Sequence, residues 1–482
     1  NDGATILTEM NTDHPAAKIL VDVAKTQDKE VGDGTTTSVV LSGELLKGAE
    51  DLLDKDIHSS TILRGYKLAA SRSLERIDEI SNKVTIKDKK LLQNIAAISM
   101  GSKSVGVGSS KDLLAKIVID AVIQVAEEKE GKLVIDQDLI KIEKKAGGNI
   151  DDTSLINGVI IDKEMVHPGM PKRIENAKIA LLDTSLEIEK TETDAKIEIT
   201  DPKQLTAFLD QEESMLKEMV SKVEKSGATV LFCQKGIDDV AQHYLSKKGI
   251  VAVRRVKRSD MEKLARATGA RIVTILSDLS SKDLGHAGII EEKKIGGEAM
   301  IFVEKCKDPK SVTILVRAST DHVVSEGERA IRDGIGAVSS AVEEGKYLFG
   351  GGACEIELAR DLREHANKVG GREQLAILAF ADALEVIPRT LAESAGMDAI
   401  DTLVSLRSKH NNKDGLVYGI NINDAKIDNM EKAGVIEPAK VKEQAIMSAS
   451  EAAEMLLRIS DMISARPKPM APPGGMGGMG DY

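Results

Sequence analysis

The two ends of the chain are patterned as helix, whereas its centre alternates short β-rich runs with helical ones. Apolar residues recur at helical spacing in two sets of stretches: 15–30, from 37 onward, 61–80, 89–98 and 111–127, and then 320–344, 353–367, 372–387 and 439–464. Between about 157 and 318, β-rich runs at 158–162, 178–183, 229–233, 250–254, 271–275 and 312–317 alternate with helical stretches near 203–224, 236–247 and 259–267. The sequence therefore predicts a multidomain α and α/β protein, in which an α/β unit is inserted into a helical domain built from both chain ends.

Length and composition narrow the class of protein further. At roughly 150 residues per domain, 482 residues correspond to about three domains. Acidic residues (78) outnumber basic ones (66), so neither nucleic acid nor a membrane surface is an expected partner. No run approaches about 18 consecutive apolar residues, and the first residues do not resemble a secretory signal, which predicts a cytoplasmic protein. The three cysteines are too few and too widely spaced for a disulfide framework or a zinc finger.

The strongest local motif is Gly32-Asp33-Gly34-Thr35-Thr36-Thr37, which lies between two helical patterns. Two glycines allow close backbone approach, and hydroxyl and N–H groups at a helix start can surround a phosphate. Asp33 is then a candidate Mg²⁺ ligand. An ordinary turn with a threonine cap is the alternative. The motif is not a Walker A loop, because no Gly-Lys-Ser/Thr follows it.

Other candidate residues are weaker when each is taken alone. Gly350-Gly351-Gly352 precedes a helical pattern and indicates either close approach to a nucleoside or a flexible helix entry. Asp333 lies beside Gly334 in a helical pattern, and the glycine indicates either close packing or access of Asp333 to a ligand. Lys103 is typical of a solvated loop lysine, Asp2 carries no signal of its own, and Cys354 is expected to be a small buried thiol.

Two further segments have unusual composition. The stretch from Glu187 to Glu213 joins a charge-rich run to a helix that carries Leu205, Phe208 and Leu209. It is either an ordinary loop and helix or a protrusion that presents an apolar helix to a partner. The tail at 467–482 is rich in Pro, Gly and Met and is expected to be disordered.

Taken together, Asn1-Asp2-Gly3-Ala4-Thr5-Ile6-Leu7, the Gly-Asp-Gly-Thr motif, the glycine run and the Gly-Gly-Met tail resemble a group II chaperonin of the archaeal, thermosome type. The resemblance implies the chaperonin fold. Its helical equatorial ATPase domain would comprise 1–87 and 346–466, its small intermediate hinge domain 88–157 and 309–345, and its inserted apical domain 158–308, with a helical protrusion at about 187–213. This order agrees with the nesting derived from the periodicity alone.

The resemblance also implies roles for individual residues with ATP and Mg²⁺ as cofactors. Asp33 would bind the metal ion, and Gly3, Gly34, Thr35, Thr36 and Thr37 would surround the phosphates. Asp2 and Asp333 would position the attacking water, and Lys103 would belong to a nucleotide-sensing loop. Gly351 and Gly352 would lie near the nucleoside, and Glu437 would contact the ribose.

The implied function is an ATP-dependent molecular chaperone that encloses non-native polypeptides in a double ring of identical or paralogous subunits, with the protrusion as a built-in lid. Family members carry several tens of residues before Asn-Asp-Gly, including a Leu-Gly-Pro-Lys-Gly loop at the phosphates, so a fragment of a longer subunit is expected. One alternative is a structural ring or filament protein that uses nucleotide as a switch without turnover. Another is a metabolic kinase or synthetase, although 157–318 offers no small-molecule site.

Overall fold

The computed structural model describes residues 3–10, 12, 14–101, 109–188, 202–412 and 414–462. The chain forms two compact units. Unit 1 combines both chain ends, Asn1–Asn82 and Lys346–Tyr482, and unit 2 is the intervening Lys83–Gly345. The joining of both chain ends in one unit agrees with the order expected from the sequence, but the helical stretches at 89–98, 111–127 and 320–344 belong to unit 2.

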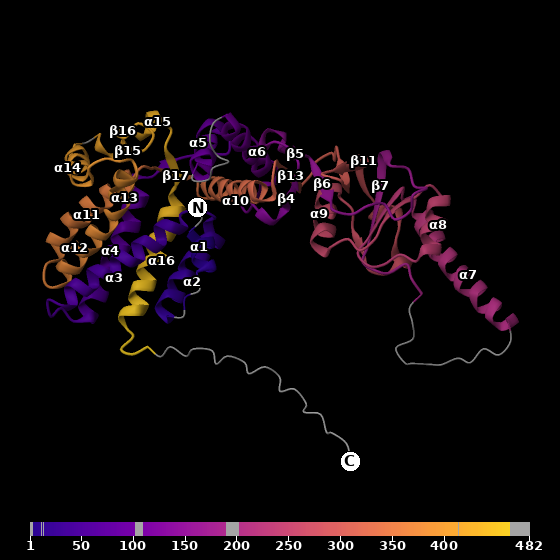
Figure 1. Cartoon of the computed structure of the whole chain (residues 1–482), viewed down its shortest axis with the longest axis horizontal. Helices are drawn as coiled ribbons and strands as arrows, with labels where there is room; N and C mark the ends of the chain where they lie inside the picture. The colour runs from indigo at the N-terminus through magenta and orange to yellow at the C-terminus, as the bar shows by residue number, and fades with distance from the viewer. Residues whose placement is uncertain are drawn as a thin grey trace, which may run out of the picture. The chain divides into compact units, whose positions relative to one another are not determined.

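Unit 1 is mainly helical, and its early and late helices pack together (Figure 1). Its helices are α1 (Gly3–Glu9), α2 (Pro15–Val31), α3 (Thr35–Leu53), α4 (Ser59–Ile80), α11 (Ala353–Val369), α12 (Glu373–Leu384), α13 (Val386–Ser394), α14 (Ala399–His410), α15 (Met430–Ala433) and α16 (Ala439–Leu457). Its strands β14 (Lys346–Phe349) and β17 (Ile436–Pro438) pair antiparallel, as do β15 (Tyr418–Asn421) and β16 (Lys426–Asn429). The short β1 (Asn82–Lys83) lies at the unit boundary.

The core of unit 1 is aliphatic, as the scarcity of aromatic residues predicts. Leucine, isoleucine and alanine side chains from α3, α4, α11, α12 and α16 fill it. Tyr66 and Phe380 are the large exceptions, and their rings meet edge to face with centroids 5.6 Å apart. The buried Tyr66 hydroxyl donates to Leu45 O at 2.7 Å, so its polar atom is satisfied.

Close contact between α4 and α12 leads to a stability prediction. A Cβ on Gly65 would lie 2.4 Å from Ala376 Cβ and 2.9 Å from Glu373 O, whereas a Cβ on Gly43 would meet nothing within 4 Å. We expect Gly65→Ala to destabilise the chain by about 1–3 kcal/mol, because α12 must shift to admit the methyl group. The matched variant Gly43→Ala, on α3, should stabilise it by about 0.5–1 kcal/mol. Thermal unfolding of both variants measures the difference, and equal midpoints would contradict the close packing of α4 against α12.

Unit 2 contains a seven-stranded sheet in the order β6-β12-β11-β7-β8-β9, with β10 also paired to β7. These strands are β6 (Gly158–Ile161), β7 (Arg173–Leu182), β8 (Val230–Cys233), β9 (Val251–Val253), β10 (Ile272–Val273), β11 (Gly285–Ile295) and β12 (Glu298–Glu304). β7, β8, β9 and β10 are parallel, and α7 (Pro202–Ser226), α8 (Asp239–Lys247) and α9 (Arg258–Thr268) connect them. This is the predicted α/β layering.

The remainder of unit 2 is a smaller α/β assembly. Strand β13 (Val312–Ala318) pairs parallel with β4 (Ile140–Ala146) and antiparallel with β5 (Ser154–Ile156). The helices α5 (Lys89–Met100), α6 (Ser109–Val125) and α10 (Asp321–Glu344) pack together beside it, and β2 (Glu127–Lys129) pairs with β3 (Lys132–Val134). No helix within the described ranges is long and apolar enough to cross a membrane.

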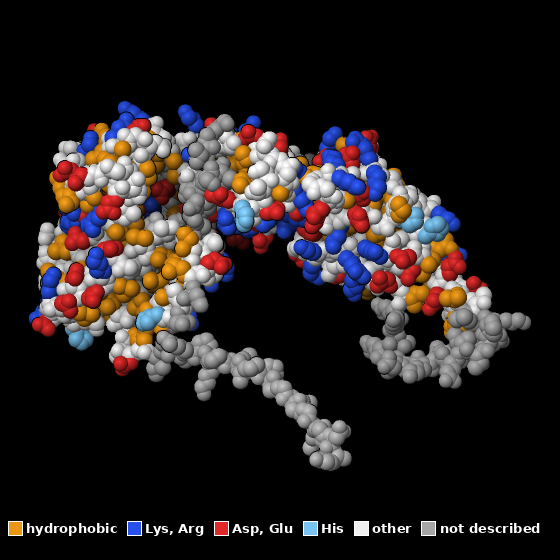
Figure 2. Space-filling model, in the orientation of Figure 1, with side chains coloured by type: hydrophobic (Ala, Val, Ile, Leu, Met, Phe, Trp, Pro, Cys, Tyr) orange, Lys and Arg blue, Asp and Glu red, His pale blue; other side chains and the backbone are white. Residues whose placement is uncertain are grey.

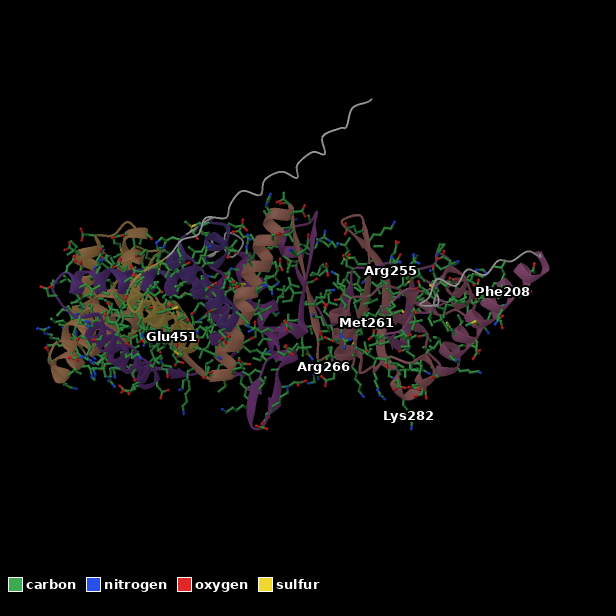
Figure 3. The ribbon with its side chains drawn as sticks, turned by 90° about the horizontal axis from the view of Figure 1, so that it is seen from below. Phe208, Arg255, Met261, Arg266, Lys282 and Glu451 are labelled. Atoms are coloured by element: carbon green, nitrogen blue, oxygen red, sulfur yellow. The ribbon has the colours of Figure 1, made fainter. Side chains whose placement is uncertain are left out.

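The predicted protrusion is described only in part. Residues 189–201 and the tail from 463 lie outside the described residues, as does the side chain of Leu205. The second half of α7 is anchored, because Leu216, Val220 and Val223 are buried in the core of the seven-stranded sheet. The first half extends past that sheet and carries Phe208, which is 44% exposed, and Leu209, which is 56% exposed (Figures 1 and 3). These two side chains are therefore not local core.

Two expectations about the elements need correction. The predicted single helix at 372–387 is two helices, because α12 ends at Leu384 and α13 begins at Val386. Pro388 lies in the first turn of α13, where its missing N–H is tolerated, whereas it would interrupt a continuous helix. The hairpin of β11 and β12 was not predicted from the sequence, although it supplies two of the seven strands.

Candidate functional site

The turn between α2 and α3 in unit 1 presents a helix start that lacks a side-chain cap. Gly32 ends α2 with φ 70°, and Gly34 precedes α3 with φ 77°, both in the left-handed region. A Cβ on Gly34 would lie 2.8 Å from Val441 Cγ1 and 3.0 Å from Gln27 Nε2, so a larger residue does not fit. Because Gly34 contributes no capping side chain, the first N–H groups of α3 and its dipole favour an anion at this point.

Asp33 is held in this turn through its own side chain and its backbone. Its Oδ1 accepts from the Gly34 N–H at 2.7 Å. Its carbonyl oxygen accepts from Gln27 Nε2 at 2.9 Å, and the same Nε2 donates to Val441 O at 3.1 Å. Gln27 is completely buried, so it fastens the turn to both α2 and α16.

The donor set at the turn fits Mg²⁺ shared with phosphate. Among the described residues, no group of three or more His, Cys, Asp or Glu side chains gathers to hold a metal ion. Mg²⁺ retains several waters and is commonly bound by one or two carboxylates together with substrate phosphates. The half-buried carboxylate of Asp33 beside an uncapped helix start is an arrangement of that kind.

The hydroxyl groups around the turn lie in different environments. Thr35 is buried, Thr36 is exposed and Thr37 is half-buried. Gly3, at the start of α1, approaches them closely, because a Cβ there would lie 2.7 Å from Thr36 Oγ1 and 3.1 Å from Thr35 Oγ1. Thr37 instead lines a small pocket that also contains Glu355 and Lys442. The structure therefore brings Gly3, Asp33, Gly34 and the three threonines together.

Glu437, on β17, joins this group from the other end of the chain. A Cβ on Gly350 would lie 2.5 Å from Glu437 Oε1, so the carboxylate lies directly against the glycine run. Burial raises the pKa of Glu437, and the negative charges of Glu355 and Asp33 raise it further, against the opposing effect of Lys442. Glu437 and Asp33 are thus close enough to interact electrostatically.

The structure favours a packing role for Gly351 and Gly352. Both have positive φ, 65° and 79°, at the entry to α11. A Cβ on Gly351 would lie 2.8 Å from Ile420 O, and one on Gly352 would lie 2.7 Å from Pro388 Cβ. Atoms of Ile420 and Pro388 therefore already occupy the space beside these two glycines. Their contact with a nucleoside stays a prediction.

Three residues of the predicted catalytic set do not lie among the described residues of unit 1. Asp333 is half-buried on α10 of unit 2, and each unit is described by itself. The adjacent Gly334 packs against Met100, because a Cβ there would lie 3.2 Å from Met100 Cγ. Asp2 and Lys103 lie outside the described residues. The roles of all three stay predictions.

The structure confirms the prediction that Cys354 is a buried thiol. It is 3% exposed in the core of unit 1. Burial raises its pKa well above the ordinary value, and Glu355 adds to that effect. The thiol therefore stays protonated and unreactive.

Sequence reasoning missed Gln27, Glu355 and Lys442. Gln27 reaches Val441 across most of the chain, a contact that no local pattern indicates. Glu355 closely follows the glycine run, and Lys442 closely follows Glu437. The available signal was that Glu355 and Lys442 are charged residues among the apolar residues of α11 and α16.

Comparison with known proteins gives concordant matches. Residues 1–467 match the TCP-1/cpn60 chaperonin family. A thermosome subunit of Methanopyrus kandleri is 61% identical over 467 residues, which cover 97% of this chain and 85% of that protein. A thermosome subunit of Methanocaldococcus jannaschii is 58% identical over 478 residues, covering 99% and 88%. The structure of an open-state monomer of a group II chaperonin from Methanococcoides burtonii matches with a TM-score of 0.66 and 43% identity, covering 89% of this chain and 100% of that one.

Proposed function

Because the chain belongs to the TCP-1/cpn60 chaperonin family, we infer that it is an ATP-dependent chaperone that folds non-native polypeptides. The observation that carries the inference is the junction of both chain ends around the α2–α3 turn. Gln27 links Asp33 to Val441 of α16 there, Glu437 interacts electrostatically with Asp33, and unit 2 is inserted between the two parts of the chain that form unit 1. This arrangement supports the binding of a phosphorylated ligand at the turn, and both parts of unit 1 continue directly into unit 2.

We assign the reaction as in-line transfer of the γ-phosphoryl group of ATP to water. The N–H groups at the start of α3, with Gly3, Gly34, Thr35, Thr36 and Thr37, hold the phosphates. Asp33 would hold Mg²⁺, which would supply positive charge to neutralise the phosphates. Asp2 and Asp333 orient the attacking water, Lys103 senses the γ-phosphate, and Gly351, Gly352 and Glu437 contact the nucleoside.

The partners follow from the same assignment. Identical or paralogous subunits form stacked rings, and non-native polypeptides are enclosed in the chamber of this double ring. Unit 2 would supply the intermediate part at 88–157 and 309–345 and the apical part at 158–308. Exposed apolar side chains along α7, among charged ones, support a client-facing or lid role for this element (Figure 2). The proposed location is the cytoplasm.

Deleting the protrusion tests the lid directly. We expect a variant that lacks 187–213 to retain ring assembly and ATP hydrolysis but to leave a bound client open to protease in the presence of ATP. The physical reason is that the segment belongs to unit 2, whereas the residues around Asp33 belong to unit 1, and that it exposes Phe208 and Leu209. The double substitution Phe208→Ser with Leu209→Ser is the milder version and should increase client cleavage in the same direction. A client that remains protected in both variants would contradict the lid assignment.

ATPase assays separate the proposal from its rivals. A chaperone should hydrolyse ATP at a rate that unfolded protein changes, and electron microscopy should show two-layered rings. A nucleotide-switched structural protein would form rings or filaments without turnover, and the comparisons do not favour it. A kinase or synthetase would consume ATP only with a small-molecule acceptor. Monomers without ATP turnover, measured on the full subunit, would overturn the proposal.

A further inference from the structure

A buried lysine in unit 1 is shared by two carboxylates from different elements. Lys442, on α16, is 7% exposed. Its Nζ lies 2.7 Å from Glu355 Oε1 and 2.7 Å from Glu437 Oε2. Burial lowers the pKa of Lys442, but the two carboxylates outweigh burial and raise it well above the ordinary value. The lysine is therefore a permanent cation between two acids.

The two carboxylates differ in where they lie. Glu355, in the first turn of α11, has a side chain only 4% exposed, whereas that of Glu437 is 23% exposed. Lys442 contacts Oε2 of Glu437, and the other oxygen, Oε1, lies against Gly350. Glu355 is thus the interior member of the triad, and Glu437 is the member that reaches the candidate nucleotide site.

Stability alone does not account for this triad. Two carboxylates and one ammonium group leave a net negative charge in a largely buried position, which is unfavourable compared with an apolar core. Glu355 Oε2 has no hydrogen-bond partner within the described part of the chain, although it is buried. Buried carboxylate oxygens are normally satisfied, so a triad that served only to stabilise unit 1 would not leave one unpartnered. What the arrangement does achieve is a fixed direction for the Glu437 carboxylate.

We propose that Lys442 is a positioning residue that aims Glu437 at the ribose of the bound nucleotide, with Glu355 holding Lys442 from the interior. By engaging Oε2, Lys442 leaves Oε1 at the Gly350 side of the site to accept from a ribose hydroxyl. It also lowers the pKa of the Glu437 carboxyl group, which burial and the charges of Glu355 and Asp33 raise. This inference rests on the proposed contact between Glu437 and the ribose.

The test compares the affinities of the full subunit for ATP and for 2′-deoxy- and 3′-deoxy-ATP. We expect the wild type to prefer ATP to one of the deoxynucleotides by about tenfold, as for the loss of one hydrogen bond to a charged group. Lys442→Met, which removes the charge and keeps an unbranched side chain, should reduce this preference to less than about twofold. Glu437→Met, which removes both acceptor oxygens, should reduce it as well.

Lys442→Met leaves Glu355 buried without its cation and could misfold for that reason, so a second variant is needed. The double variant Lys442→Met with Glu355→Gln removes both interior charges and should fold while still losing the ribose preference. Lys426→Met is the matched control. Lys426 Nζ also lies between two carboxylates, 3.2 Å from Asp424 Oδ2 and 3.1 Å from Asp428 Oδ2, but it is 55% exposed and does not contact Glu437. This control should keep the wild-type preference.

Loss of the preference in the Lys442 variants and in Glu437→Met, but not in Lys426→Met, supports the positioning role. If Glu437→Met loses the preference while the folded double variant keeps it, the role of Lys442 is purely structural and this inference fails alone. If Glu437→Met keeps the preference, the ribose assignment in the proposed function is wrong, and the inference fails with it.

Discussion

The Asp333→Asn variant is expected to bind ATP with nearly unchanged affinity but to hydrolyse it roughly 10²-fold or more slowly. The proposed role of Asp333 is to orient the attacking water, which affects the chemical step and not the phosphate contacts. Asparagine has almost the same shape, and Gly334 keeps α10 packed against Met100, so the helix should not move. Single-turnover hydrolysis and nucleotide binding, measured on the same preparation of the full subunit, provide the two numbers.

A neighbouring charge on the same helix supplies the control for Asp333. Arg332 is exposed and pairs with Glu328 at 3.0 Å on the helix surface. Such an exposed pair contributes little to stability, so Arg332→Gln should retain hydrolysis. Near-normal turnover by Asp333→Asn, or equal loss in both variants, would reject the water-positioning role.

The helical and α/β patterns of the sequence are the features that predicted the fold best. Long amphipathic stretches such as 320–344 and 353–367 became α10 (Asp321–Glu344) and α11 (Ala353–Val369) with nearly the same bounds. In the first half of α10 the buried residues Val324, Gly327, Ala330 and Ile331 recur at helical spacing, whereas 334–342 of α10 and 353–359 of α11 are buried all round. Where burial and period coincide over several turns, the local sequence is sufficient.

The hairpin of β11 and β12 shows that the spacing of apolar residues does not predict every strand. Charged residues at 291–294 interrupt the apolar alternation of β11, because that end of the strand lies where salt bridges such as Lys293–Glu304 can form. The turn between β11 and β12 was nevertheless readable. Gly296 and Gly297 both have positive φ, 62° and 87°, as a two-residue hairpin turn requires. A Gly-Gly pair between two potential strands was the signal that went unused.

The candidate site was predictable only in its local part. Gly32 to Thr37 is contiguous, so its glycines and hydroxyls could be read from the sequence. Gln27 and Lys442 act through contacts with distant segments, Val441 in one case and Glu355 in the other. Their roles depend on how α2, α11 and α16 pack, which no single-sequence pattern specifies. The resemblance to a family added Glu437, but the lysine that holds it required the structure.

The Asp33→Asn variant is expected to lose the Mg²⁺-dependent part of its ATP affinity. The side-chain oxygen of the introduced asparagine can still accept from the Gly34 N–H, as Asp33 Oδ1 does at 2.7 Å, so the turn should persist while the negative charge is lost. With a metal ligand removed, ATP affinity in the presence of Mg²⁺ should fall about tenfold or more, equivalent to ~1.4 kcal/mol. Calorimetric titration of ATP with Mg²⁺ and with a chelator present measures both states.

A comparison with Asp33→Ala separates the metal from the turn. Alanine removes the acceptor for the Gly34 N–H as well as the charge, so it should show the same loss with Mg²⁺ and a further loss with chelator, because the start of α3 is then less well ordered. If Asp33→Asn instead binds ATP with Mg²⁺ as tightly as the wild type, the carboxylate is not a metal ligand. Asp33 would then serve only to close the turn through its hydrogen bond to Gly34, and any loss should appear in Asp33→Ala alone.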